Sequence, residues 1–148
     1  MATPLPLDTS VFFKLVRVVN LTARPFLETV GKQHHLSLNE WRVMVVLASH
    51  PGVSATDVAE STGLDKMSVS RALGALERRG RLLRKDNPDD QRKSRLYLSA
   101  QGKRLFGKIG IAAKKREAEL FRGVQKRELD QLGATLDKLI GALREQGP

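Results

Sequence analysis

Two clusters of cationic and hydroxyl side chains carry most of the chemistry that this sequence offers. The first cluster consists of Lys66, Met67, Ser68, Ser70 and Arg71, and the second of Gln91, Arg92 and Lys93 next to Asp90. Arginine and lysine pair with phosphate oxygens, and arginine and serine also hydrogen-bond to base edges in a duplex groove. The clusters therefore predict contacts with double-stranded DNA, the first cluster lying nearest the bases.

The sequence gives no comparable support for catalysis or metal binding. It has no Gly-x-x-x-x-Gly-Lys loop, no Gly-x-Ser-x-Gly elbow and no His-Glu-x-x-His helix. Cysteine is absent, which excludes disulfides, thiol-based sensing and cysteine-type zinc sites. The adjacent His34 and His35 would point about 100° apart on a helix, so they do not predict a shared metal ion. We therefore expect no enzyme activity, no cofactor and no metal site.

The first cluster lies on a predicted helix that begins after the N-cap residue Asp65 and stops at Gly80. Its predicted buried stripe has the spacing of one helix face and consists of Val69, Ala72, Leu73 and Leu76. Arg71 then lies on the opposite face among small residues, which allow close approach to a groove. Taken alone, the segment fits an ordinary amphipathic surface helix equally well.

The flanking segments favour a DNA-binding motif. Upstream, Ser54 and Asp57 predict a capping box for a short helix, and only Thr62, Gly63 and Leu64 separate the two helices, as in a helix-turn-helix. Downstream, residues 81–85 and 94–98 have strand patterns, and residues 86–93 between them are rich in turn formers. The second cluster would thus lie at the cationic tip of a β-hairpin, or wing.

The net charge of +10 favours a polyanionic partner. Residues 66–85 contain seven cations and one acid, and residues 91–116 contain nine cations and no acid. Basicity alone would also fit RNA or an anionic membrane surface. No apolar run approaches the roughly 20 residues of a membrane span, and no signal segment opens the chain. The simplest expectation is a cytoplasmic protein that does not enter membranes.

Helices are also predicted outside this region. Caps at residues 8–10 precede a first helix that is apolar around much of its circumference, and Pro25 should kink or split it near Thr22. Ser37 and Glu40 predict a capping box for the next helix. The core stripe of that helix is predicted to be Leu38, Trp41, Met44, Val45, Leu47 and Ala48. We interpret Trp41 as a core anchor rather than a ligand-stacking residue.

The C-terminal part predicts two further helices. Ser99 caps a long basic helix, and the last helix carries leucines with alternating spacings of three and four residues: Leu129, Leu132, Leu136, Leu139 and Leu143. This spacing is typical of the seam of a packed helix pair. The seam either covers the core of one chain or forms a two-fold interface between two chains.

The order and spacing of several motifs resemble the MarR family of winged-helix regulators. These motifs are Ser37-Leu-Asn-Glu-Trp41, Leu76-Glu-Arg-Arg-Gly80, Asp90-Gln-Arg92 and Leu98-Ser-Ala-Gln-Gly102, and the resemblance covers roughly residues 11–143. Many members have Asp-Arg-Arg or Asp-Lys-Arg in the wing and Leu-Thr at the next helix, so this sequence departs mildly at Gln91 and Ser99. The resemblance implies a mainly α-helical fold with a small β-wing. It places a winged helix-turn-helix lobe at residues 37–98 and dimerisation helices at residues 8–36 and 99–146 of a single MarR-type chain.

The resemblance also implies a homodimeric, sequence-specific transcriptional repressor that a small molecule releases. The helix from Lys66 would enter the major groove of a pseudo-palindromic DNA site, and Arg92 would enter the flanking minor groove. Asp90 would order the wing turn or pair with a neighbouring arginine. A small phenolic or other anionic effector would bind between the two lobes. The alternative is an architectural protein that coats nucleic acid with little sequence preference.

Overall fold

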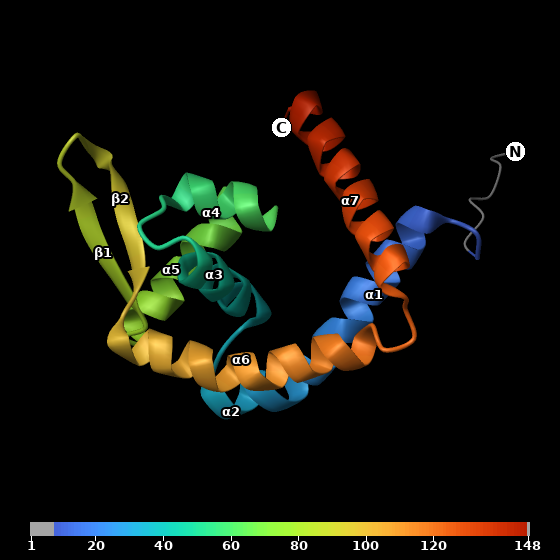
Figure 1. The fold of residues 1–148 in the computed structure, drawn as a ribbon. Helices are drawn as coiled ribbons and strands as arrows, with labels where there is room; N and C mark the ends of the chain where they lie inside the picture. The colour runs from blue at the N-terminus through green and yellow to red at the C-terminus, as the bar shows by residue number, and fades with distance from the viewer. Residues whose placement is uncertain (1–7, 148) are drawn as a thin grey trace, which may run out of the picture. The chain divides into compact units, whose positions relative to one another are not determined.

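The described part of the chain is mainly helical and includes a two-stranded antiparallel sheet, as the sequence predicts (Figure 1). The structure is a computed structural model that describes residues 8–147, without the side chains of Asn87, Asp90, Gln91 and Arg92. The described residues form two compact units that divide after Gly107. The elements are α1 (Val11–Phe26), η1 (Leu27–Gly31), α2 (Lys32–His34), α3 (Leu38–Ser49), α4 (Ala55–Thr62), α5 (Lys66–Arg78), β1 (Leu82–Asn87), β2 (Asp90–Leu98), α6 (Ala100–Leu120) and α7 (Lys126–Gln146).

Helix α1 begins at a serine cap and continues through its proline. Ser10 Oγ accepts a hydrogen bond from the backbone N–H of Phe13 at 3.2 Å. Pro25 lies inside α1, which runs from Val11 to Phe26, so the helix is not split near Thr22, one of the two predicted outcomes. A proline removes one intrahelical hydrogen bond, but the next turn here makes others. Thr29 Oγ1 donates to the Pro25 carbonyl at 2.6 Å, and the irregularity appears as the π-helical turn η1.

Helices α3, α4 and α5 pack against one another and form the centre of the first unit. Helix α3 starts with the predicted capping box, in which Ser37 and Glu40 bond to each other's backbone N–H. Its buried face differs from the predicted stripe. Val43 and Val46 are buried, whereas Val45 is exposed and Leu38 is only half-buried. The predicted stripe follows apolar residue type, whereas the helix period places Glu40, Val43, Met44 and Leu47 on one buried face.

Trp41 packs in an aromatic stack, as expected for an anchoring residue. Its ring centroid lies 6.3 Å from that of Phe26 and 5.1 Å from that of Phe106. The Phe106 ring is inclined by only 22° to the indole, which gives a stacked contact. The stack joins the end of α1 and the start of α6 to helix α3.

Strands β1 and β2 form a hairpin that contacts α3, α4 and α5. Leu82 pairs with Leu98, and Asn87 pairs with Asp90 after a register shift. Only Pro88 and Asp89 form the turn, so the predicted turn over residues 86–93 is too long. A two-residue connection lets the backbone ladder continue through the polar residues near the tip. Figure 1 shows the tip projecting beyond these helices.

Large apolar side chains on the first and last helices stay exposed in the single chain. On α1 these include Phe12, which is 74% exposed, together with Val11, Val18, Val19 and Leu21. On α7 the predicted seam leaves Leu132 42% and Leu143 64% exposed. Within the described residues, no helix is both long and apolar enough to cross a membrane. These faces are therefore uncovered surfaces of the kind that mark protein interfaces.

Candidate DNA-binding interface

Helix α5 has the cap and the buried stripe that the sequence predicts. Asp65 accepts hydrogen bonds from the backbone N–H of Ser68 at 2.7 Å and from its hydroxyl at 2.9 Å. These bonds lower the pKa of the Asp65 carboxyl, because they stabilise its charged form. The stripe Val69, Ala72, Leu73 and Leu76 is buried against the rest of the first unit. The opposite face is therefore fixed toward solvent.

The first cluster lies on this solvent-facing side. Lys66, Ser70 and Arg71 are exposed, and Met67 is 65% exposed. Ser68 is half-buried, and its hydroxyl proton already bonds to Asp65. Ser68 therefore offers a partner its acceptor lone pairs, whereas Ser70 offers both donor and acceptor.

The turn before α5 confirms the helix-turn-helix. Gly63 ends α4 with φ +76°, a left-handed conformation that favours glycine. Thr62 Oγ1 donates to the Val58 carbonyl at 2.7 Å and accepts from the Leu64 N–H at 3.2 Å. Asp57 completes the α4 capping box, and the hydrogen bonds from Ser54 lower its pKa. The turn is thus held by its own residues.

Two cationic side chains of strand β1, Arg84 and Lys85, have partners within the first unit. Arg84 on β1 forms an ion pair with Glu77 on α5, and this pair ties the wing to the helix. Lys85 Nζ lies 5.0 Å from the centroid of the Tyr97 ring on the opposite strand, within cation–π range. A Cβ at Gly74 would lie 3.2 Å from Arg78 Nη1, so this glycine leaves room for the Arg78 guanidinium along the helix.

The second cluster is only partly described. Lys93 is exposed, and its charge adds to the lowering of the Asp57 pKa. The side chains of Asp90, Gln91 and Arg92 lie outside the described residues, although their backbone forms the start of β2. Their predicted roles in the wing therefore stay predictions.

Arg81 is the residue of this region whose role the sequence did not indicate. The sequence predicts it at the start of a basic strand, but its side chain is buried, and this burial lowers the pKa of its guanidinium. Its guanidinium donates to the carbonyls of His34 at 2.6 Å and His35 at 3.2 Å, at the end of α2. These partners lie 46 and 47 residues away, and no local pattern reveals such a contact.

Arg81 also brings the start of α6 close to the end of α5. Its backbone N–H donates to the Leu76 carbonyl at 2.8 Å, and its carbonyl accepts from the Ser99 N–H at 3.0 Å. A Cβ at Gly102 would lie 2.2 Å from that carbonyl oxygen, so only glycine fits there.

No metal-binding cluster of histidines and carboxylates occurs within the part of the chain that the structure describes.

A capped helix-turn-helix followed by a two-stranded wing defines a winged-helix DNA-binding protein. Residues 34–93 match the model of the MarR family, which confirms the resemblance predicted from the sequence motifs. The chain is 25% identical over 118 residues, 80% of either protein, to the homoprotocatechuate degradative operon repressor of Escherichia coli.

Solved structures of transcriptional regulators share the fold. A MarR/EmrR family regulator from Acinetobacter sp. ADP1 superposes with a TM-score of 0.86 at 24% identity, covering 95% of this chain and 99% of that one. CouR from Rhodococcus jostii RHA1, solved with p-coumaroyl-CoA, superposes with a TM-score of 0.80 at 22% identity, covering 93% and 96%.

Proposed function

We propose that this protein is a sequence-specific, double-stranded-DNA-binding transcriptional regulator, and a binding protein rather than an enzyme. The observation that carries the proposal is the exposed face of α5, where Lys66, Met67, Ser70 and Arg71 lie beside a cationic wing. The buried stripe fixes this face outward, as insertion into a groove requires. Because its partner is chromosomal DNA, we expect the protein in the cytoplasm.

In this proposal the two DNA-binding elements have different roles. The N-terminal half of α5 lies in the major groove, where Arg71 and Ser70 reach base edges and Lys66 reaches phosphates. The wing lies along the backbone, and Arg92 enters the minor groove, whose negative potential attracts a guanidinium. Gln91 and Lys93 contact the adjacent sugar-phosphate backbone, and Asp90 orders the tip.

The regulator acts as a homodimer in this proposal. The uncovered apolar faces of α1 and α7 favour a partner of the same kind, because such faces cost free energy while they contact water. A two-fold dimer presents two copies of α5 and therefore reads a pseudo-palindrome with half-sites about 34–36 Å apart. Residues 8–36 and 99–146 would form the dimerisation lobe, and residues 37–98 the DNA-binding lobe.

A small anionic or phenolic molecule would relieve repression. Two observations on related proteins support this part of the proposal: one relative is a repressor of a degradative operon, and CouR was solved with an acyl-CoA thioester. The high positive charge of the present chain suits an anionic effector as well as DNA.

Titrations of the protein against duplex DNA test the proposal. An operator selected from random sequences should bind about 10³-fold or more tightly than random duplex at the same salt concentration. Arg71→Ala should cost about 1–3 kcal/mol on the operator and much less on random DNA. Arg127→Ala, which removes the same charge from α7, is the matched control and should leave the specificity ratio unchanged.

The same titrations distinguish a sequence-specific regulator from the alternative, an architectural protein that coats nucleic acid with little sequence preference. If no selected sequence exceeds random DNA in affinity, the protein coats nucleic acid without sequence preference. If Arg71→Ala loses equal affinity on both duplexes, α5 only positions the protein on the backbone, and our base-reading assignment is wrong.

A further inference from the structure

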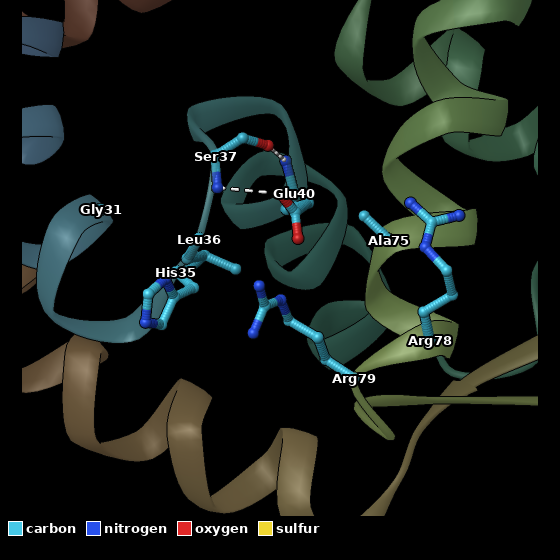
Figure 2. Close-up of a pocket in the computed structure, with 8 residues that line it drawn as sticks. All are labelled: Gly31, His35, Leu36, Ser37, Glu40, Ala75, Arg78 and Arg79. Carbon is cyan, nitrogen blue, oxygen red and sulfur yellow. Dashed lines mark hydrogen bonds between the residues drawn. The ribbon is translucent and has the colours of Figure 1, made fainter.

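The N-terminal helical segment, residues 11–34, meets the helix-turn-helix at a junction between the end of α2 and the end of α5. Helices α3, α4 and α5 pack closely on one another, whereas the N-terminal segment contacts them at fewer points. A cavity of about 530 Å³ lies between the two sides of the junction. Figure 2 shows His35 and Glu40 on one side of this space and Ala75 and Arg78 of α5 on the other. Apolar packing therefore cannot by itself fix the distance across the junction.

Arg81 connects the two sides of the junction by hydrogen bonds. Its guanidinium donates to the carbonyls of His34 at 2.6 Å and His35 at 3.2 Å. Its backbone N–H donates to the Leu76 carbonyl at 2.8 Å, within the last turn of α5. One residue thus attaches the end of α2 to the end of α5, with its side chain on one element and its backbone on the other.

The end of α2 leaves two carbonyls for this contact. His35 has φ +49°, a left-handed conformation that ends the helix. The Leu36 N–H donates back to the Gly31 carbonyl at 3.1 Å, so this local bond does not use the carbonyls of His34 and His35. A cation at this position also favours the negative end of the helix dipole. The guanidinium of Arg81 therefore caps the N-terminal segment from a distant part of the chain.

Burial and geometry keep this guanidinium in one place. Arg81 is only 9% exposed, and its planar fork donates to two successive carbonyls. Burial and the charge of Arg79 lower its pKa, whereas the carboxylate of Glu40 raises it. Arginine stays charged in proteins, so the group remains a donor at every nitrogen. A buried guanidinium that left these carbonyls would lose both bonds without water to replace them.

We propose that Arg81 sets the orientation of the recognition helix α5 relative to the N-terminal segment, and that it thereby determines which half-site spacing the dimer accepts. The second part rests on the proposed function, because α1 carries one of the apolar faces assigned to the dimer interface. In a two-fold dimer, a change at the junction moves both copies of α5 by the same amount in symmetric directions. Arg81 is a positioning residue in this proposal and does not contact DNA itself.

The junction is measured first, without DNA and within one chain. The sequence has no cysteine, so Arg17→Cys on α1 and Ser61→Cys on α4, both at exposed positions, carry a unique pair of spin labels. Dilution with unlabelled chains isolates the distance within one chain. By double electron–electron resonance, we expect one narrow distance distribution with Arg81 in place, and a broader distribution in Arg81→Met. An unchanged distribution in Arg81→Met would overturn the proposal.

Operators with altered spacing test the consequence for DNA recognition. One added base pair moves a half-site by about 3.4 Å and turns it by about 35° around the duplex. The wild-type dimer should bind its selected operator about 100-fold more tightly than duplexes with one base pair added or removed between the half-sites, because only the correct spacing engages both half-sites. In Arg81→Met this preference should fall below about 10-fold. Affinity for a duplex with a single half-site should stay unchanged, because the reading face of α5 is intact.

The two measurements separate the failure of this inference from the failure of the proposed function. A spacing preference that Arg81→Met retains would overturn the role of Arg81 in recognition. A wild-type protein without any spacing preference would overturn that role together with the proposed dimer, and the distance within one chain would still decide whether Arg81 orients α5.

Two further variants separate positioning from stability. Val58→Ala removes buried methyl groups from α4, which packs on α3, α5 and β2, so it lowers stability away from the junction. Its label distances and its spacing preference should match those of the wild type. Arg81→Lys keeps the charge and a donor but lacks the planar fork, so it should recover part of both properties. If Val58→Ala loses the preference as Arg81→Met does, or if Arg81→Lys recovers nothing, Arg81 is not a positioning residue.

Discussion

The winged helix-turn-helix and the terminal helices differ in how complete they are within one chain. Each helix of the former begins at a side-chain cap, its stripe is buried, and its wing is tied to α5 by an ion pair. The terminal helices α1 and α7 instead keep large apolar side chains in water. The first region is complete within one chain, whereas the second leaves apolar surface exposed in the single chain.

The comparison explains how the two regions can have separate tasks. A DNA-reading surface must be rigid before it meets DNA, because ordering it on binding would cost affinity. An apolar helix face has no such requirement, because in the proposed dimer its burial against a second copy would order it and stabilise it together. In the proposed dimer, the contact between the two chains would set the distance between the two copies of helix α5.

The largest expected effect comes from a charge placed in the α7 seam. Leu136→Glu would bury an unpartnered carboxylate in the proposed interface, at a cost of several kcal/mol. We expect monomers at micromolar concentration by light scattering, and loss of operator affinity in parallel. Ala134→Glu, on the opposite face of α7, should leave the dimer intact. A wild-type protein that is monomeric under these conditions would contradict the two-fold arrangement.

A smaller effect should follow when the winged-helix region loses its buried arginine. Arg81→Met keeps the apolar stem but leaves the carbonyls of His34 and His35 without their donor. The free energy of unfolding should fall by about 2–3 kcal/mol in urea titrations. Arg84→Met removes an exposed ion pair and should cost less than about 1 kcal/mol. Equal losses for the two variants would show that Arg81 does not act through its long-range contacts.

The elements were predictable from local signals, because caps, glycine stops and apolar periodicity act within a few residues. Asp65, Gly63 and the Val69 stripe all behave as their patterns indicate. The predicted kink or split near Thr22 rests on the N–H that proline lacks, but α1 continues through Pro25 and the irregular turn η1 follows it. The wing turn was predicted too long, because polar residues can join a backbone ladder without apolar side chains.

The candidate site was predictable only where it consists of one helix face. The exposed cluster on α5 follows from the burial of its opposite stripe. The sequence predicts Glu40 as a helix cap, but not that its carboxylate is buried with one oxygen lacking a hydrogen-bond partner. It indicates Arg81 only as a basic residue, although the side chain is buried. Both depend on segments that are distant in sequence, and periodicity carries no information about such contacts.

A substitution at the wing tip tests the predicted contact between Arg92 and DNA with little effect on the stability of the fold. Arg92→Ala should leave stability nearly unchanged but weaken DNA binding and relax any preference for A·T-rich flanks. The slope of log affinity against log salt should fall in magnitude by about one if Arg92 neutralises one phosphate. Flank-swapped duplexes at several salt concentrations measure both quantities. An unchanged slope together with an unchanged flank preference would remove Arg92 from the interface.

The smallest expected effect is the acid sensitivity of the α4 cap. The carboxyl of Asp57 accepts from the Ser54 N–H at 3.0 Å, and the bonds from Ser54 hold its pKa below the usual range. Because the pKa is higher in the unfolded chain, the charged carboxylate stabilises the fold above about pH 4, and this contribution is lost as the pH falls through the folded-state value. Asp57 is exposed, so screening keeps the effect below about 1 kcal/mol. Urea unfolding of wild type and Asp57→Asn should converge in acid and differ at neutral pH. Asp137→Asn, which removes a carboxylate in the middle of α7, should show no such convergence, and identical pH profiles for wild type and Asp57→Asn would mean that the cap contributes nothing.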